Sequence, residues 1–271
     1  MKKHFEEWRL FLTPDVRFAN GMLGDITMKE FLAYIKEAKA KGEYELVDIL
    51  GDRDDNPDVN ININGRTYKK VWWTSDTHFS HKNIIKYASR PHSSVQEMDD
   101  DLIRRWNHYV GDDDLVFHLG DISLTDPART RSILDTLNGS ILFIKGNHDK
   151  SATDNKCLSR FVRTVQGGVQ VPYREYMSLK IIDPYDIGLY RNDGRKDRMF
   201  VMSHYPIASW DAIHHGSIHL FGHCHGTFDH RTIGKMLDVG VDGPISYFRP
   251  LGLNQILVYM DNTEMYTGFD Q

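Results

Sequence analysis

Short polar motifs recur along the chain, and each is built from residue types that bind metal ions or transfer protons. They are Asp76-Thr77-His78, Gly120-Asp121, Gly146-Asn147-His148-Asp149, Ser203-His204 and Gly222-His223-Cys224-His225. Their carboxylate, amide and imidazole groups suit manganese, iron, zinc or nickel better than thiolate-binding metals. An aspartate can bridge two ions, and two ions ~3.5–4 Å apart can clamp the attacking and leaving oxygens of an in-line displacement. The motifs are therefore candidates for a two-metal hydrolytic site.

The elements that must position these motifs alternate between strands and helices. Strands are predicted at Val71–Ser75, Leu115–Leu119, Ile141–Lys145, Met199–Ser203, Ile218–Phe221 and Leu237–Val241. Helices are predicted after the Ser94/Glu97 capping box and over Pro127–Asn138, with Gly139 as the stop. Alternation with short connections predicts an α/β fold with helix-covered sheets. In such folds, ligands collect at the carboxyl ends of strands, which is where the motifs fall.

The glycines of the motifs support the same placement. Gly120, Gly146 and Gly222 each precede a candidate ligand at a strand exit, where a tight turn and close backbone approach favour glycine. Taken singly, each motif is more often a structural feature or a solvated turn than a ligand. Their joint occurrence, in order and each at a strand end, reverses that preference.

Residues 1–68 differ from the rest and are predicted to form an α+β appendage to a domain spanning 69–271. A capping box at Thr27 and Glu30 begins a helix that stops at Gly42. Asn64-Gly65 then lies between two strand-like segments, which predicts a type I′ hairpin. Because the hairpin continues directly into the strand Val71–Ser75, we expect the appendage to pack on the core.

Composition narrows the class of protein. The 271 residues are 40% hydrophobic and 26% charged, which is typical of a soluble globular chain with a sizeable core. No apolar run approaches the ~18–20 residues that span a bilayer. Glu6, Glu7 and Arg9 stand where a signal peptide would be apolar, and two cysteines are too few for a disulfide framework, so a cytoplasmic protein is expected. The net charge of −5 mildly disfavours a nucleic-acid substrate.

In this order the motifs resemble the calcineurin-like metallophosphoesterase superfamily. DTH, GD, GNHD, SH and GHCH match its DxH, GD, GNH(E/D), H and GHxH blocks, and the resemblance covers residues 70–250. The stretch from Trp73 to Ser123, with its downstream Arg-Pro, and VGVD at 239–242 most resemble a small bacterial and phage-type branch. The resemblance implies a four-layer α/β/β/α sandwich of two mixed sheets flanked by helices.

The resemblance also implies two divalent ions, with manganese favoured over iron, zinc and nickel. It assigns Asp76, His78 and His225 to the first ion, Asn147, His204 and His223 to the second, and Asp121 as the bridge. His148 would bind a phosphate oxygen and protonate the leaving group, and Asp149 would orient His148 by a hydrogen bond. A hydroxide bridging the ions would attack phosphorus.

Three further residues have two interpretations each. His81 could contact substrate or support a ligand, or it is a loop histidine with no task. His118 reads slightly better as a satisfied buried histidine than as a group that orients a ligand. Arg90 could grip phosphate from a loop over the site, although a surface ion pair is the favoured interpretation.

The favoured function is hydrolysis of nucleotides or small phosphoesters, by a phosphomonoesterase or cyclic phosphodiesterase. The chain departs from protein Ser/Thr phosphatases, since it has GDISLTD and GNHD in place of GDxxDRG and GNHE. A nuclease of the same superfamily is the first alternative. A non-catalytic binding scaffold is the second, and it would be expected to show a broken ligand set, whereas none of the blocks is missing here.

Overall fold

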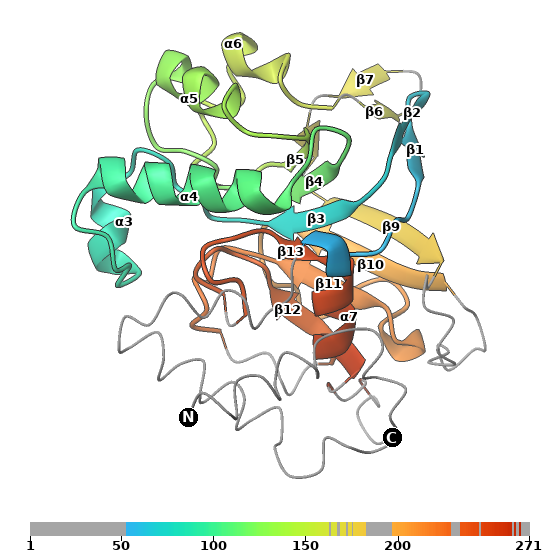
Figure 1. The fold of residues 1–271 in the computed structure, drawn as a ribbon. Coiled ribbons are helices and arrows are strands. Elements are labelled where there is room, and N and C mark those ends of the chain that lie inside the picture. The colour runs from blue at the N-terminus through green and yellow to red at the C-terminus, as the bar shows by residue number, and fades with distance from the viewer. Residues whose placement is uncertain are drawn as a thin grey trace.

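The computed structural model describes residues 53–162, 164–166, 169–171, 173–174, 176–182, 197–228, 234–243, 245–261, 263 and 266. The helix predicted between Thr27 and Gly42 lies outside these residues. Within them, two β-sheets pack face to face, and helices cover the outside of the larger sheet (Figure 1).

The larger sheet has the strand order β13-β3-β4-β5-β8, and the smaller sheet has the order β12-β11-β10-β9. The larger sheet contains β3 (Val71–Thr74), β4 (Leu115–His118), β5 (Ser140–Ile144), β8 (Tyr173–Arg174) and β13 (Leu251–Gly252). The smaller sheet contains β9 (Tyr176–Ile182), β10 (Asp197–Ser203), β11 (Ile218–Phe221) and β12 (Met236–Asp238). Pairing is parallel except where β13 joins β3 and where β9 joins β10. Both sheets are therefore mixed, and the predicted α/β fold is confirmed.

Buried apolar side chains form a layer on each face of the larger sheet. Between the two sheets, the Trp73 ring stacks on Phe117 of its own sheet and on Phe200 of the smaller sheet, with centroid distances of 5.7 and 5.2 Å. The helix α7 (Leu253–Asp261) adds apolar side chains to this layer. On the outer face, Trp72 belongs to a cluster that includes Trp106 of α4 (Val95–Tyr109). Fully burying side chains of this size stabilises a fold by about 1.5–3 kcal/mol each.

The outer helices begin and end at residues with the expected capping chemistry. The longest is α4 (Val95–Tyr109), where the Ser94 hydroxyl accepts a hydrogen bond from the Glu97 amide, so that the predicted cap is confirmed. The shorter α5 (Pro127–Leu134) is capped by Asp126, whose side chain accepts hydrogen bonds from the Ala128 and Arg129 amides, and it ends before the predicted Asn138. The remaining short helices are α3 (Lys82–Tyr87), α6 (Asn155–Leu158), η3 (Arg53–Asp55) and η4 (Ile213–His215).

The registers of the parallel strands bring their carboxyl ends level with one another. Thr74 pairs with His118, and His118 pairs with Phe143, so that β3, β4 and β5 end side by side. The amide of Asp76 then donates to the Gly120 carbonyl at 2.9 Å. A further bridge joins Ser75 to Gly240 beyond β12, and this bridge connects the ends of the two sheets. The segments after all these strands therefore meet in one place.

The predicted hairpin before β3 is confirmed. Strands β1 (Ile61–Ile63) and β2 (Arg66–Tyr68) pair in antiparallel register around Asn64 and Gly65. These two residues have φ of 53° and 82°, and positive φ at both central positions is the mark of a type I′ turn. A second short hairpin pairs β6 (Thr164–Gln166) with β7 (Val169–Val171).

Asn56 joins the segment before the hairpin to the larger sheet. Its side-chain amide donates to the Val71 carbonyl of β3 at 2.9 Å, and its amide oxygen accepts from the Leu253 amide of α7 at 2.8 Å. The Asn56 side chain is buried, so both partners depend on it for their hydrogen bonds.

We predict that Asn56→Ala lowers the free energy of unfolding by roughly 2–4 kcal/mol, because it leaves two buried backbone groups unpaired. Urea unfolding followed by circular dichroism measures this change. The matched control is Asn62→Ala, since the Asn62 side chain is exposed on the hairpin and bonds to Thr67 at 3.3 Å. Equal losses in the two variants would show that the Asn56 contacts do not hold this segment to the core.

Candidate metal centre

The predicted ligands meet at the carboxyl ends of the two sheets. Two sets of three ligand atoms form there, with the atoms of each set within 4.8 Å of one another. We call Asp76, His78 and His225 the first group, and Asp121, His204 and His223 the second group. Strands of the larger sheet precede Asp76, His78 and Asp121, and strands of the smaller sheet precede His204, His223 and His225. The site is therefore built only where the two sheets pack together.

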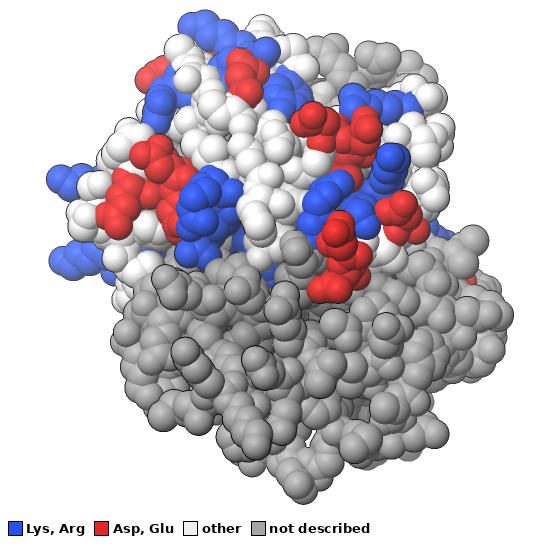
Figure 2. Space-filling view, in the orientation of Figure 1, with Lys and Arg blue, Asp and Glu red and all other residues white. Residues whose placement is uncertain are grey.

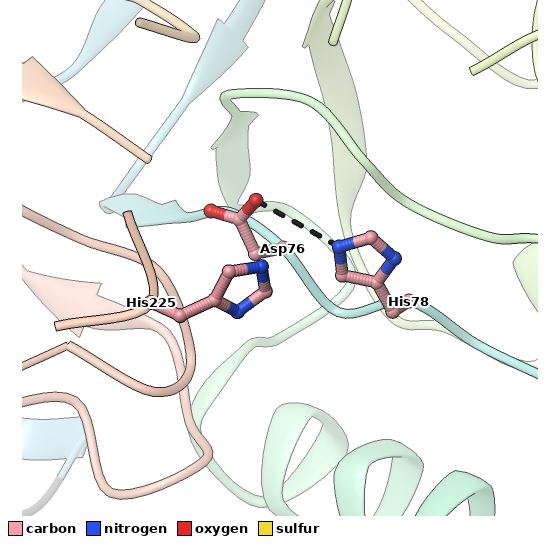
Figure 3. Close-up of side chains that lie close together, drawn as sticks. All are labelled: Asp76, His78 and His225. Atoms are coloured by element: carbon pink, nitrogen blue, oxygen red, sulfur yellow. Dashed lines mark ion pairs between the residues drawn. The ribbon is translucent and has the colours of Figure 1, made fainter. Parts of the chain in front are cut away.

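In the first group, the three side chains face one another (Figure 3). The Nε2 atom of His78 lies 4.0 Å from Oδ1 of Asp76. Both atoms are buried, and neither has a hydrogen-bond partner. Unpaired buried polar atoms are costly, and a divalent cation held by both would satisfy them. The residues present thus fit a bound metal ion.

In the second group, His204 is fixed by its other ring nitrogen. Its Nδ1 donates to the Leu119 carbonyl at 2.8 Å, which directs Nε2 toward the remaining ligands. Nε2 lies 3.5 Å from Oδ2 of Asp121 and 3.0 Å from Oδ1 of Asn147. Asn147 therefore adds an amide oxygen beside this group, as the sequence predicts.

Asp121 lies between the two groups. Its Oδ2 atom is 3.6 Å from Nε2 of His78 in the first group and 3.5 Å from Nε2 of His204 in the second. Its other oxygen accepts the His148 amide at 2.8 Å, which fixes the plane of the carboxylate. One carboxylate oxygen close to a histidine of each group is the arrangement that a bridging ligand requires.

The ligands lie on turns whose backbone is strained. Left-handed φ values between 48° and 70° occur at Asp76, His78, Asp121, His223 and His225. Side chains other than glycine rarely adopt this region, and each such residue costs on the order of 1–3 kcal/mol. Strain of this kind persists where surrounding contacts enforce it, and here it accompanies the residues with metal-binding chemistry.

Two glycines are required by close approach, as the sequence predicts. A Cβ atom on Gly146 would lie 2.6 Å from the Asp121 amide nitrogen and 2.9 Å from Cε1 of His204. A Cβ atom on Gly222 would collide with the side chains of Ser75 and Asp76. Any larger residue at these positions would therefore displace candidate ligands.

His148 lies beside the two groups but belongs to neither. Its ring centroid is 5.6 Å from that of His78, and its side chain is exposed. No hydrogen bond between the Asp149 carboxylate and the His148 ring is found among the described residues, and this expectation is corrected. Asp149 is buried, and its carboxylate accepts the amides of Gly146, Asp121 and Ile122 at 2.7, 2.7 and 2.8 Å. It thereby joins the turn after β4 to the turn after β5.

His118 is buried and supports the segment that carries Asp76 and His78. Its Nδ1 accepts the Gly120 amide at 3.3 Å, so Nε2 carries the proton and donates to the Thr77 hydroxyl at 3.0 Å. Burial lowers the pKa of His118 to about 3, which keeps the ring neutral. The Thr77 hydroxyl in turn donates to the Ile122 carbonyl at 2.8 Å. His118 thus lies behind the ligands and not among them.

His81 and Arg90 occupy different surroundings from each other. His81 is half-buried, and its Nδ1 lies 3.4 Å from Nδ1 of His78, so it contacts a candidate ligand. The ion pair expected for Arg90 is present but buried, so only its expected place at the surface is corrected, and the guanidinium supports the backbone of candidate ligands. It is 5% exposed and forms a two-bond ion pair with Asp242.

Two further residues of the site, Asp242 and Tyr205, were not predicted from the sequence. Asp242 accepts a hydrogen bond from Nδ1 of His225 at 2.7 Å, and the only sequence signal is its place in VGVD after a strand. Tyr205 follows His204 directly, and its ring centroid lies 4.9 Å from His204 and 4.8 Å from His223. Its hydroxyl lies 3.3 Å from Oδ1 of Asn147, and the side chain is 48% exposed. Tyr205 therefore forms an aromatic wall beside the second group.

Burial and the neighbouring charges shift the pKa values of the ligands in opposite directions. Burial raises the pKa of Asp76 to about 7. Burial would lower the pKa of His204, but the hydrogen bond to Asp121 and the charges of Asp76 and Asp121 outweigh it and raise that pKa to about 9. Burial would raise the pKa of Asp121, but the hydrogen bond and charge of His204 outweigh it and lower that pKa to about 2. Before an ion binds, the second group is thus protonated on His204 near neutral pH.

We predict that Mn²⁺ binding releases protons and strengthens from pH 6 to pH 9. His204, with a pKa of about 9, must lose its Nε2 proton to ligate, and Asp76, with a pKa of about 7, must also be ionised. Titration calorimetry in two buffers of different ionisation enthalpy measures the protons released. His215→Ala serves as the control, because His215 is exposed on η4 away from the ligands. Binding without proton release at pH 7 would contradict the assignment of His204 as a ligand.

Comparison with known proteins agrees with this geometry. The family model of the calcineurin-like phosphoesterases matches residues 69–239. The chain therefore belongs to the calcineurin-like phosphoesterase family, whose members act on phosphoesters and depend on metal ions. In the part of the chain that the structure describes, no helix is long and apolar enough to cross a membrane.

Individual relatives cover the chain to different extents. An uncharacterized protein of Methanocaldococcus jannaschii is 51% identical over 84 residues, which are 30% of this chain and 48% of that protein. The chain thus spans about half the length of that relative. The gene 66 protein of Mycobacterium phage D29 is 28% identical over 195 residues, or 64% of this chain and 87% of that protein. A protein of unknown function from Aquifex aeolicus has 18% identity and a TM-score of 0.47, over 69% of this chain and 97% of that one.

Proposed function

We propose that the protein hydrolyses nucleotides or other small phosphoesters at a binuclear metal centre, as a phosphomonoesterase or a cyclic phosphodiesterase. The observation that carries the proposal is the position of Asp121. One of its oxygens lies within 3.6 Å of a histidine nitrogen in each of the two groups. This is what a carboxylate shared by two ions requires, and a single-ion site would not need it.

Each group of residues would hold one of the two ions. Asp76, His78 and His225 would hold one ion, Asn147, His204 and His223 would hold the other, and Asp121 would bind both. Two divalent ions, with manganese favoured for this oxygen and nitrogen donor set, would supply Lewis acidity and lower the pKa of the attacking water. The anionic Asp76 and Asp121 offset part of that positive charge, which keeps the site able to release an anionic product.

His148 is the candidate proton donor to the leaving group. Its exposed ring lies beside the first group, and within the described residues its side chain makes no hydrogen bond that would occupy a ring nitrogen. The hydrogen bond from the His148 backbone amide to Asp121 fixes the position of the His148 main chain, from which the ring projects. A donor in this position could reach an oxygen that leaves phosphorus, whereas Asp149 contributes by holding the backbone and not by orienting the ring.

The described part of the face seen in Figure 2 is more typical of a protein with a small substrate than of one that holds a nucleic acid. On the face seen in Figure 2, acidic and basic side chains alternate, and the described part of that face has no extended basic area. Proteins that hold a nucleic-acid backbone usually present such an area. Tyr205 offers an exposed ring beside the second group, which suits a phosphoester with an apolar or aromatic portion. A panel of cyclic nucleotides, nucleoside monophosphates, a bis(p-nitrophenyl) phosphodiester and single-stranded DNA, supplied with Mn²⁺, tests this choice.

We predict that Asp121→Ala abolishes both hydrolysis and stabilisation by metal ions, because it removes the ligand shared by the two groups. Mn²⁺ should raise the melting temperature of the wild-type protein, since ions bind the native site and not the unfolded chain. Thermal unfolding with Mn²⁺ and with EDTA measures this, together with the rate on the substrate panel. Asp112→Ala is the control, because Asp112 is exposed and lies before β4. Full activity in excess EDTA, with an empty site by metal analysis, would contradict the proposal.

We predict that His148→Ala keeps its metal content but loses activity according to the leaving group. A positioned general acid contributes ~10²–10⁴-fold to the rate, and an alkoxide leaving group needs the proton far more than p-nitrophenolate does. The ratio of variant to wild-type kcat/KM should therefore fall much further for a nucleotide or alkyl ester than for the matched p-nitrophenyl ester. Equal losses on the two esters would leave His148 a purely electrostatic role.

A further inference from the structure

Arg90 and Asp242 lie 152 residues apart in the chain and meet behind the first group. Their side chains are 0% and 5% exposed. Arg90 follows α3, and Asp242 follows the bridge between Ser75 and Gly240 that connects the two sheets. The pair thus joins two segments that the strands alone do not connect.

The guanidinium of Arg90 is fully engaged. Its Nε donates to Oδ1 of Asp242 at 2.9 Å, and its Nη2 donates to Oδ2 at 2.7 Å, which is the two-bond geometry that only arginine provides. Nη2 also donates to the Asp76 carbonyl at 2.7 Å, and Nη1 donates to the Thr77 carbonyl at 2.9 Å. Arg90 therefore holds the backbone on which Asp76 and His78 lie.

Asp242 connects the same pair to the third member of the first group. Its Oδ2 accepts from Nδ1 of His225 at 2.7 Å. Because a carboxylate accepts and does not donate, the proton stays on Nδ1, and Nε2 is presented to an ion. The pair is thus one hydrogen bond away from His225 and from the main chain of Asp76 and Thr77.

Stability alone does not explain this arrangement. A buried ion pair is often no more stabilising than apolar side chains of the same volume, because burying the charges costs as much as their attraction returns. Here the pair contacts two segments with left-handed φ, one at Asp76 and His78 and the other at His225, and such segments need enforcing contacts to keep their shape. The contacts of the pair are made to the segments that carry the first group, at the Asp76 and Thr77 carbonyls and at Nδ1 of His225.

We propose that Arg90 and Asp242 are positioning residues that set the affinity of the first group for its metal ion and do not contact substrate. This inference rests on the proposed function in requiring that the first group binds an ion separately from the second group. Arg90 fixes the segment Asp76–His78, and Asp242 fixes the orientation and tautomer of His225. The charge of Arg90 also offsets the negative charge that Asp242 would otherwise add next to the ligands.

The test measures Mn²⁺ binding to the stripped full-length protein by titration calorimetry, which does not depend on activity. Asp242→Asn keeps the shape of the side chain but replaces one of its two hydrogen-bond-accepting oxygens with an NH₂ group. That group then faces a donor of Arg90 or of His225. We expect the affinity of one of the two ions to fall by ~10–100-fold, as is usual when a partner of a metal-binding histidine is changed, and that of the other to stay within about twofold. Activity of the variant should recover as Mn²⁺ is raised. Arg90→Lys, which keeps the charge but loses the two-bond geometry, should show a smaller selective loss.

The matched control is Asp114→Asn. Asp114 is also a buried carboxylate paired with an arginine, Arg53, and it accepts from Trp72 and Gly111, but it lies at the opposite end of β4 from the ligands. Asp114→Asn should lower the melting temperature of the protein and leave its affinities for both ions unchanged. The positioning role would be contradicted if Asp242→Asn or Arg90→Lys behaved like this control. It would also be contradicted if either variant lowered the affinity for both ions equally.

The same titrations separate this inference from the proposed function. A wild-type protein that binds two ions but hydrolyses none of the panel would contradict the proposed function, and the selective loss would still test the positioning role. If Asp242→Asn does not fold by circular dichroism, Arg90→Lys decides the matter alone, because an unchanged affinity for both ions in that variant contradicts the proposal.

Discussion

Buried negative charge at the carboxyl ends of the strands is the constraint on which the rest of the site depends. Carboxylates at this edge lie close enough to raise one another's pKa, and each needs donors that water would otherwise supply. They are Asp76, Asp121, Asp149, Asp238 and Asp242. Most of them are satisfied within the protein: Asp149 by three backbone amides, Asp238 by the amides of Gly226 and Gly240, and Asp242 by Arg90 and His225.

Asp76 is the exception, and its position explains the chemistry of the site. One of its oxygens accepts the His223 amide at 2.8 Å, but the other is buried with no hydrogen-bond partner and faces the equally unpaired Nε2 of His78. This buried acceptor and this ring nitrogen lie side by side within a set whose other members are satisfied, an arrangement that fits a bound cation better than a further hydrogen-bond donor. The carboxylates of Asp149, Asp238 and Asp242 are thus engaged in hydrogen bonds within the protein, whereas Asp76 and Asp121 belong to the two groups of candidate metal ligands.

The two sheets provide rigidity, and the turns after them provide the ligands. Strands level at their carboxyl ends fix where each turn begins, and hydrogen bonds such as that from the Asp76 amide to the Gly120 carbonyl fix one turn against the next. The left-handed residues then direct short side chains inward, which regular strand geometry would not do because successive residues point to opposite faces. The ordered strands fix where each turn begins, and the strained turns then direct the side chains into the site.

Local features could be predicted from the amino-acid sequence: the strands before each motif, the Asn64-Gly65 turn, the cap at Ser94 and the ligand types at the strand ends. These follow from patterns within a few residues, such as apolar runs, turn propensity and capping chemistry. Given that parallel strands end together, they also sufficed to predict which side chains would meet. The helix end predicted at Asn138 was less well determined, since α5 ends at Leu134, and helix ends depend on small differences in local energy.

Which polar groups form hydrogen bonds with one another could be seen only in the folded protein. Asp149 adjoins His148 in the chain but bonds to backbone amides, because the folded turn brings three of them to its carboxylate and the His148 ring points elsewhere. Arg90 reads as a loop cation, yet it is buried against Asp242, which is 152 residues away. Such pairings depend on distance in space and on what burial leaves unpaired, and neither is written in the spacing of residues along the chain.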